Sequence, residues 1–342
     1  MTVYKPTANP MCHDRRGILR LGAAAAGVAL MPGMARAAGQ KGAGQDGGGQ
    51  QGAGFYRFDV GNKRLIAVSD GSAVSDQDPH QIFGYNVPKA AFDAAMESRF
   101  QPTDSRVAYY HPLFVETGDH KVLIDTGWGE SNPDFGKLRG RLAAAGVAAE
   151  DVDVVVLTHG HPDHVWGNFD QDGNRLFPNA RFVMGAHEYG FWTAESVDLS
   201  GMKIPESFKT NIIKGAKRHL DPLKGEIELV QDGDEIVPGL SAVMAPGHTP
   251  GHMGVLIDGG GENQLLHAVD AAINWPTGLL YPEWYTAFDL DPATAAATRR
   301  RLFDRAATDK MMVYAYHFPF PGLGHVVHAD GAFDWVPVAW KW

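Results

Sequence analysis

Apolar residues from position 55 onward occur in short runs separated by turn-forming residues. The first two runs lie on either side of Gly61-Asn62, so they predict a β-hairpin over residues 55–68. A second hairpin is predicted from a strand at 106–116 and a strand at 120–124. The continuous apolar run at 154–157 predicts a buried strand. Further strands are expected at 180–184, 311–316 and 333–338.

Helices are predicted between these strands. Asp291-Pro292 is a typical helix start, with aspartate as the cap and proline in the first turn, and the helix continues through 294–307. Residues 195–224 are polar and resemble an insertion between core elements. Because hairpins alternate with helices, the pattern favours an α/β fold other than a doubly wound parallel sheet. The other helices are expected at 88–99, 138–145, 186–194 and around 208–216.

Composition and charge exclude several classes of protein. The chain has 342 residues, of which 44% are apolar and 20% charged, as in ordinary globular proteins. Its formal charge is -10, and loss of residues 1–37 would leave 25 basic and 39 acidic residues, near -14. Such acidity argues against a nucleic-acid partner, which requires a basic surface. Cys12 is the only cysteine, so residues 55–342 can form no disulfide and offer no thiol nucleophile or cysteine ligand.

The amino terminus predicts export. Residues 1–37 combine the pair Arg15-Arg16, a short apolar segment and a small-residue cleavage site at 35–37, which is typical of a twin-arginine signal peptide. We therefore expect the twin-arginine export machinery as a partner and a periplasmic or secreted location. The apolar segment is too short for stable membrane insertion, which needs about 20 residues. Residues 38–54 are rich in Gly and Gln and predict a flexible linker to a single folded domain at 55–342.

The densest group of metal-binding side chains follows the strand predicted at 154–157. His159, His161, Asp163 and His164 fall within one seven-residue stretch. In an extended turn, residues two positions apart point the same way, so His159 and His161 can bind one ion while Asp163 and His164 reach a second. Nitrogen and oxygen donors suit zinc, and a catalytic zinc keeps one position open for water. The pattern therefore predicts a metal site and not merely a polar loop.

This stretch resembles the His-x-His-x-Asp-His signature of the metallo-β-lactamase superfamily, and the resemblance covers residues 55–342. The remaining donors follow in the expected order, each after an apolar run. The resemblance implies two divalent metal ions, most simply zinc, bridged by Asp270. It assigns three donors to each ion: His159, His161 and His248 to the first, and Asp163, His164 and His317 to the second.

The same resemblance implies a fold and a reaction. The fold is a four-layer αββα sandwich, with two facing sheets, helices on the outer sides and a dinuclear metal site at the strand ends. Two ions lower the pKa of a shared water, and the bridging hydroxide can attack a carbonyl or phosphoryl centre. Asp163 is expected to carry a proton to the leaving group, and both Asp163 and Asp270 are candidate catalytic residues. A redox variant of the superfamily has Glu at the position of His161, so hydrolysis is favoured here.

Residues 317–325, together with Phe191-Trp192 and the amino terminus, are similar to the methyl parathion hydrolase group and its lactonase relatives. This similarity implies small lactones, esters or phosphotriesters as substrates, with N-acyl homoserine lactones as the favoured class. The alternatives are a cysteine-free metallo-β-lactamase, a glyoxalase II-type thioesterase and a periplasmic zinc-binding protein without activity. Asp270 argues against the first, the lack of a basic cluster against the second, and the intact donor set against the third.

Several residues around the metals are given supporting roles. The resemblance implies that Asp125 orients a ligand histidine from behind, and His252 is expected to lie behind the ligands as well. Trp192 and Phe208 are candidates for an aromatic wall of the substrate pocket, although either could pack in the core. A tyrosine is expected beside the metals, and the sequence leaves Tyr189, Tyr281 and Tyr285 open. It also leaves open whether the chain forms a homodimer.

Overall fold

The computed structural model describes residues 52–129 and 135–341. The predicted signal peptide at 1–37 and all but three residues of the linker at 38–54 lie outside the described residues. The first described strand starts at Phe55, where the hydrolase domain was expected to begin. Among the described helices, none is both long and apolar enough to cross a membrane.

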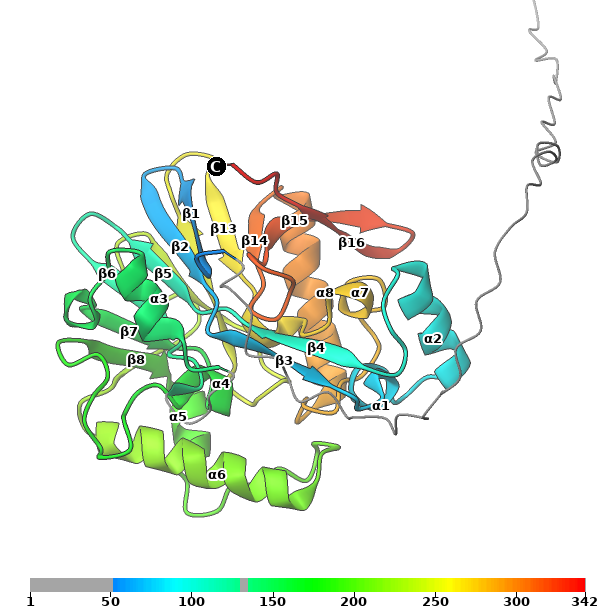
Figure 1. The fold of residues 1–342 in the computed structure, drawn as a ribbon, viewed down its shortest axis with the longest axis horizontal. Coiled ribbons are helices and arrows are strands. Elements are labelled where there is room, and N and C mark those ends of the chain that lie inside the picture. The colour runs from blue at the N-terminus through cyan, green and yellow to red at the C-terminus, as the bar shows by residue number, and fades with distance from the viewer. Residues whose placement is uncertain (1–51, 130–134, 342) are drawn as a thin grey trace, which may run out of the picture. The chain divides into compact units, whose positions relative to one another are not determined.

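The amino-terminal half of the described chain forms a seven-stranded sheet (Figure 1). Its first four strands in spatial order pair antiparallel, and the pairs from β6 to β9 are parallel. The predicted hairpin over 55–68 is its β1–β2 edge. In spatial order the sheet contains β1 (Phe55–Val60), β2 (Lys63–Val68), β5 (Leu113–Glu116), β6 (Lys121–Ile124), β7 (Val154–Leu157), β8 (Arg181–Gly185) and β9 (Glu228–Val230).

The carboxy-terminal half forms a second seven-stranded sheet in simple sequence order. All of its neighbours pair antiparallel except β13 and β14, which are parallel because the longest helix connects them. Its strands are β10 (Glu235–Val237), β11 (Leu240–Met244), β12 (Met253–Asp258), β13 (Gln264–His267), β14 (Met312–Tyr314), β15 (Leu323–Ala329) and β16 (Ala332–Pro337).

Apolar side chains bury both faces of each sheet. In β7 all four residues are buried, with Val154 and Val156 packed between the sheets and Val155 and Leu157 packed under the outer helices. A continuous apolar run is what a strand covered on both faces requires. The layer between the sheets contains residues of both, such as Val122 from the first and Val255 from the second. The predicted four-layer αββα sandwich is thereby confirmed.

Helices form the two outer layers. On the first sheet, buried residues of α2, α3, α5 and α6 join one apolar cluster. On the second sheet, Leu302 and Phe303 of α8 pack against β13 to β15. The helix start predicted at Asp291 is confirmed, because its carboxylate accepts a hydrogen bond from Thr294 N at 3.0 Å. The helices are α1 (Pro79–Phe83), α2 (Lys89–Ser98), α3 (Leu138–Ala144), α4 (Pro162–Val165), α5 (Ala186–Trp192), α6 (Glu206–Leu220), α7 (Trp275–Gly278) and α8 (Pro292–Thr308).

One predicted strand is wrong. The segment 106–116 divides into two strands at His111-Pro112, because proline has no N–H to continue a ladder. Only β5 joins the first sheet, where it forms the predicted hairpin with β6. The preceding part, β4 (Arg106–Tyr110), pairs with β3 (Gly71–Ser75) in a separate two-stranded ribbon. This ribbon runs towards α1 and forms one wall of the functional site (Figure 1).

Candidate active site

The first donor set lies where the two sheets meet at their strand ends. The loop after β7 carries His159 and His161, and the loop after β11 carries His248. His161 Nδ1 lies 3.1 Å from His159 Nε2 and 3.0 Å from His248 Nε2, so three ring nitrogens converge on one point. All three histidines are buried. Histidine nitrogens in this arrangement are typical of a zinc site.

The second donor set lies beside the first. Asp163 and His164 occupy the first turn of α4, and His317 follows β14. Asp163 Oδ2 lies 3.4 Å from His164 Nε2 and 3.5 Å from His317 Nε2. Within the described residues, two groups could each hold a metal ion, and together they contain the seven predicted ligands: His159, His161, His248 and Asp270, and Asp163, His164 and His317.

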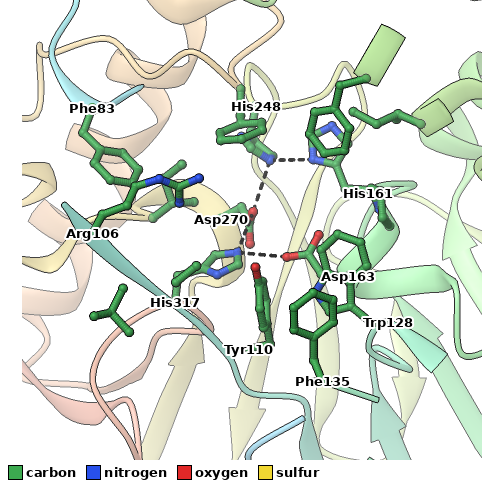
Figure 2. Close-up of a pocket in the computed structure, with 17 residues that line it drawn as sticks. Phe83, Arg106, Tyr110, Trp128, Phe135, His161, Asp163, His248, Asp270 and His317 are labelled. Atoms are coloured by element: carbon green, nitrogen blue, oxygen red, sulfur yellow. Dashed lines mark hydrogen bonds and ion pairs between the residues drawn. The ribbon is translucent and has the colours of Figure 1, made fainter. Parts of the chain in front are cut away.

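Asp270 connects the two sets. One of its oxygens, Oδ2, lies 3.2 Å from His248 Nε2 in the first set and 3.1 Å from His317 Nε2 in the second (Figure 2). Its other oxygen, Oδ1, lies 3.4 Å from His164 Nε2. A carboxylate between two groups of imidazole nitrogens has the position that a bridging ligand needs. The donors present thus fit two divalent metal ions.

Hydrogen bonds behind the ligands determine which ring nitrogen faces the centre. Asp125 accepts from His164 Nδ1 at 2.7 Å and from the Thr158 amide and hydroxyl at 2.9 and 2.8 Å. His317 Nδ1 donates to the Tyr109 carbonyl at 2.7 Å. Such bonds fix the tautomer, so that Nε2 presents its lone pair to a metal. Asp125 therefore lies where it was predicted, behind His164.

His248 is oriented by a residue that sequence reasoning missed. Its Nδ1 donates to Asp289 Oδ1 at 2.9 Å, and Asp289 in turn accepts from Arg299 at 3.3 Å. The predicted His252 lies behind the centre as well, with its Nδ1 donating to the Ala245 carbonyl and its Nε2 accepting from the Asp270 amide. Asp289 lies 41 residues from His248, and no local pattern marks it.

A second missed residue, Glu188, holds the metal-binding loops together. Its Oε1 accepts from Gly160 N at 3.0 Å and from the Trp192 indole at 2.6 Å, and its Oε2 accepts from Gly251 N at 2.8 Å. It is fully buried on α5. Gly160 is required here because a Cβ would lie 2.4 Å from the Trp192 indole nitrogen. The loop after β7 and the loop after β11 are thereby tied to one helix.

Burial and neighbouring charges shift the pKa values of the donors. Burial lowers the pKa of His159 and His161 well below the usual value, so both rings are neutral and can offer lone pairs. Burial alone would raise the pKa of Asp270, but His317 and His164 hold it well below its usual range. Asp270 is therefore an anionic carboxylate, which is the form that binds a metal.

A cavity of about 200 Å³ opens directly onto both donor sets. Its floor includes His161, Asp163, His248, Asp270 and His317 (Figure 2). Its walls are mostly apolar and aromatic, which suits a small organic substrate. The predicted Phe208 lies in one of these walls, as do Phe83, Trp128, Phe135, Ile273 and Phe288.

The structure corrects the prediction for Trp192. This residue is fully buried and is not among the residues that line the cavity. Its ring lies behind the first donor set, 5.8 Å from the His161 ring, and its indole donates to Glu188. The hydrogen bond that the indole donates to the buried Glu188 carboxylate turns the ring towards the loop after β7 and away from the cavity.

The tyrosine that lines the cavity beside the donor sets also differs from the three considered. Tyr189, Tyr281 and Tyr285 do not line the cavity, whereas Tyr110 does. The Tyr110 ring centre lies 5.9 Å from that of His317, and burial raises the pKa of its hydroxyl, with Asp163 adding to the shift. Tyr110 therefore keeps its proton and can donate a hydrogen bond. The alternation of side chains along β4 could have indicated Tyr110, but the prediction of a single strand over 106–116 obscured this alternation.

Comparison with known proteins agrees with this geometry. The model of the metallo-beta-lactamase superfamily matches residues 110–317. An N-acyl homoserine lactonase of Bacillus sp. is 25% identical over 178 residues, 46% of this chain. The alignment spans 62% of that lactonase, so the chain matches less than two thirds of its length.

Two solved structures resemble the chain over most of its length. The dizinc quorum-quenching lactonase AidC, in complex with the product N-hexanoyl-L-homoserine, has a TM-score of 0.79 and 26% identity and covers 84% of this chain and 98% of its own. The hydrolase AbOPH has a TM-score of 0.76 and 27% identity, and the match covers 85% of this chain and 100% of AbOPH. Both structural relatives are hydrolases.

Proposed function

The chain belongs to the metallo-beta-lactamase superfamily and is a metal-dependent hydrolase, and we propose that it opens the ring of N-acyl homoserine lactones. The observation that carries this proposal is the cavity, whose floor includes members of both donor sets and whose walls are mostly apolar. A polar lactone can react at the floor while an acyl chain lies against the walls. The likeness to a lactonase that binds N-hexanoyl-L-homoserine supports this substrate class.

Each residue of the site has a role in the proposed reaction. When bound, two divalent ions, zinc in the simplest case, activate water and polarise the lactone carbonyl. The Tyr110 hydroxyl lies in the cavity beside His317 and donates a hydrogen bond to an oxygen of the substrate. Asp163 faces the same cavity, with 13% of its side chain exposed, and would accept the proton that the attacking water loses and pass it to the alkoxide that leaves when the ring opens.

Aryl esters and phosphotriesters are a second proposed substrate class. Besides Tyr110, five Phe and Trp side chains line the cavity and provide surfaces on which an aryl leaving group can pack: Phe83, Trp128, Phe135, Phe208 and Phe288. Metal ions held by the two donor sets would polarise a phosphoryl oxygen in the same way as a carbonyl oxygen. This activity would use the same site as lactone hydrolysis.

The proposal is tested by measuring turnover and metal content together. Residues 50–342, the compact unit, would be assayed with N-hexanoyl homoserine lactone, paraoxon and nitrocefin. We expect about two metal ions per chain, lactone turnover, and loss of at least about 10³-fold in Asp270→Ala. Tyr110→Phe should lower kcat about tenfold to a hundredfold without loss of metal, because only a substrate contact is removed. Nitrocefin turnover without lactone turnover would refute the lactonase assignment.

We further propose that the protein is exported by the twin-arginine route to the periplasm or the exterior. This proposal rests on the pair Arg15-Arg16 and the following apolar segment, which lie outside the described residues. Cell fractionation of the full chain and of a variant with Lys at both arginines tests it. Export that continues unchanged in the double Lys variant would exclude the twin-arginine route.

A further inference from the structure

Arg106 differs from its neighbours in the cavity because it places a charged group in a mostly apolar wall. Alternate residues of a strand share a face, and Arg106, Ala108 and Tyr110 of β4 all line the cavity. The Arg106 guanidinium extends into the cavity beside Phe83, with its Cζ 5.7 Å from the centre of that ring (Figure 2).

Arg106 has no partner among the described residues. It forms no ion pair or hydrogen bond there, and its Nε is buried without an acceptor. Arg299, which is fully buried, is paired instead: it donates to the carbonyls of Ala271, Pro282 and Trp284 and to Asp289. The cation–π contact with Phe83 offsets only part of the hydration that a partly buried guanidinium without acceptors loses. The fold therefore does not account for Arg106.

We propose that Arg106 is a specificity-determining residue that binds an oxygen acceptor on the acyl part of the substrate. The inference rests on the proposed function, which places the reacting carbonyl at the donor sets. Tyr110 marks that end of β4, and Arg106 lies four residues along the strand, about 13 Å away between Cα atoms. The small side chain of Ala108 lies between them and leaves room for an acyl chain along the strand.

The chemistry of guanidinium defines the preferred acyl groups. Its N–H donors form a planar fork that matches a carboxylate at two points and can also donate to a single carbonyl oxygen. Acyl chains with a terminal carboxylate should therefore be favoured most, and chains with a ketone next. Unsubstituted alkyl chains leave the guanidinium unpaired and should be the poorest substrates of the three.

The test compares three homoserine lactones of equal chain length that carry hexanoyl, 3-oxohexanoyl or 5-carboxypentanoyl groups. For the unaltered protein we expect kcat/KM about tenfold higher for the carboxylated chain than for hexanoyl, with the ketone between them. Arg106→Met should bring the ratio close to one, chiefly by raising KM for the carboxylated and 3-oxo substrates. Arg106→Lys should keep part of the carboxylate preference, because lysine remains a point charge.

Arg64→Met is the matched control. Arg64 lies on β2, is 79% exposed, forms only a loose pair with Glu116 at 3.8 Å, and carries the same charge outside the cavity. Its removal should leave the substrate ratios unchanged. Equal losses for all three substrates in Arg106→Met, or an unchanged ratio, would overturn the inference, because the residue would then be structural or uninvolved.

A binding measurement separates this inference from the lactonase proposal. With the metal-loaded protein, one carboxylate of adipate can bind the metal ions while the other reaches Arg106. Hexanoate has no second carboxylate and can make only the first of these contacts. Calorimetry should show adipate binding about tenfold more tightly than hexanoate, and Arg106→Met should abolish the difference. If lactones are not hydrolysed but this difference appears, the lactonase proposal fails and the role of Arg106 stands. Equal binding of the two acids would refute that role.

Discussion

At the scale of single residues, the site separates into side chains that face the centre and side chains that orient them. The donors are recognisable in the sequence because each follows an apolar strand, and seven of them lie where the resemblance assigned them. The orienting residues come from distant segments: Asp289 is 41 residues from His248, and Glu188 is 63 residues from Gly251. Asp125 and His252 could be predicted, because Asp125 is placed by the superfamily pattern and His252 lies four residues after the ligand His248.

Asp125→Asn should weaken metal binding while leaving the fold intact. An amide can still accept from the Thr158 N–H, but its NH₂ group would face His164 Nδ1, which is itself the donor in the native bond. The His164 ring would lose its fixed tautomer, so we expect affinity at the second donor set to fall about 10- to 100-fold. Competition with a chromogenic chelator measures this change.

Asp170→Asn provides the comparison for that experiment, because the Asp170 carboxylate accepts hydrogen bonds only within its own turn, from Asp172 and Asn174. It should bind metal as the unaltered protein does. Equal affinities for Asp125→Asn and Asp170→Asn would show that Asp125 does not orient His164.

At the scale of elements, α5 acts as a clamp on the two loops of the first donor set. Glu188→Ala would leave three buried donors without an acceptor, namely the amides of Gly160 and Gly251 and the indole of Trp192. Each unsatisfied buried donor costs about 1–3 kcal/mol, so we expect the free energy of unfolding to fall by roughly 3–5 kcal/mol. Urea unfolding measures the loss.

Glu206→Ala is the control for the clamp, because Glu206 is an exposed helix glutamate whose side chain contacts only Lys209. Its effect on unfolding should stay below about 1 kcal/mol. A similar small effect for Glu188→Ala would mean that the three donors find other acceptors and that α5 does not clamp the loops.

Most elements could be predicted from periodicity, and the failures have a physical cause. β1, β2 and β7 were predicted at their observed bounds, because burial on one or both faces leaves a clear apolar pattern. Residues 107–115 are apolar or aromatic except for His111, so their pattern does not reveal that His111-Pro112 turns the chain from the β3–β4 ribbon into the first sheet. That misassignment obscured Arg106 and Tyr110, whose shared face becomes visible only when β4 is a separate strand.

At the scale of the whole molecule, buried neutral histidines make folding stability depend on pH. His219 is buried on α6 beside Trp166, and burial, with a smaller effect from Arg218, lowers its pKa to about 4. The unfolded chain binds a proton near pH 6.5, whereas the folded chain does not, so the free energy of unfolding falls as pH decreases from about 6.5 towards 4. At pH 5 the loss from this one group is about 2 kcal/mol.

His219→Gln should therefore flatten the dependence of stability on pH. Denaturant unfolding at pH 7 and pH 5 would be compared in the presence of chelator, so that metal release does not contribute. The difference between the two pH values should be smaller by about 2 kcal/mol in His219→Gln than in the unaltered protein. His328→Gln, which removes an exposed histidine paired with Asp304, should leave that difference unchanged. An unaltered pH dependence in His219→Gln would mean that His219 is protonated in the folded state.

The donor sets join the two halves of the sandwich. The loop after β7 belongs to the first sheet, whereas His248, Asp270 and His317 follow strands of the second sheet. Metal ions bound to the folded chain alone stabilise it by mass action, about 4 kcal/mol for each site at a thousandfold excess over Kd. Removal of metal with a chelator should therefore lower Tm by roughly 10 °C or more, as measured by calorimetry.

Asp270→Ala tests whether the stabilising metal is bound at the two donor sets, because the variant removes the carboxylate that contacts both of them. Its Tm should respond much less to the chelator than that of the unaltered protein. If the chelator lowers the Tm of both proteins by the same amount, the metal that stabilises the fold binds outside the two donor sets. If neither responds, the sheets are held by the apolar layer between them alone, and the metals serve the reaction without contributing to the stability of the fold.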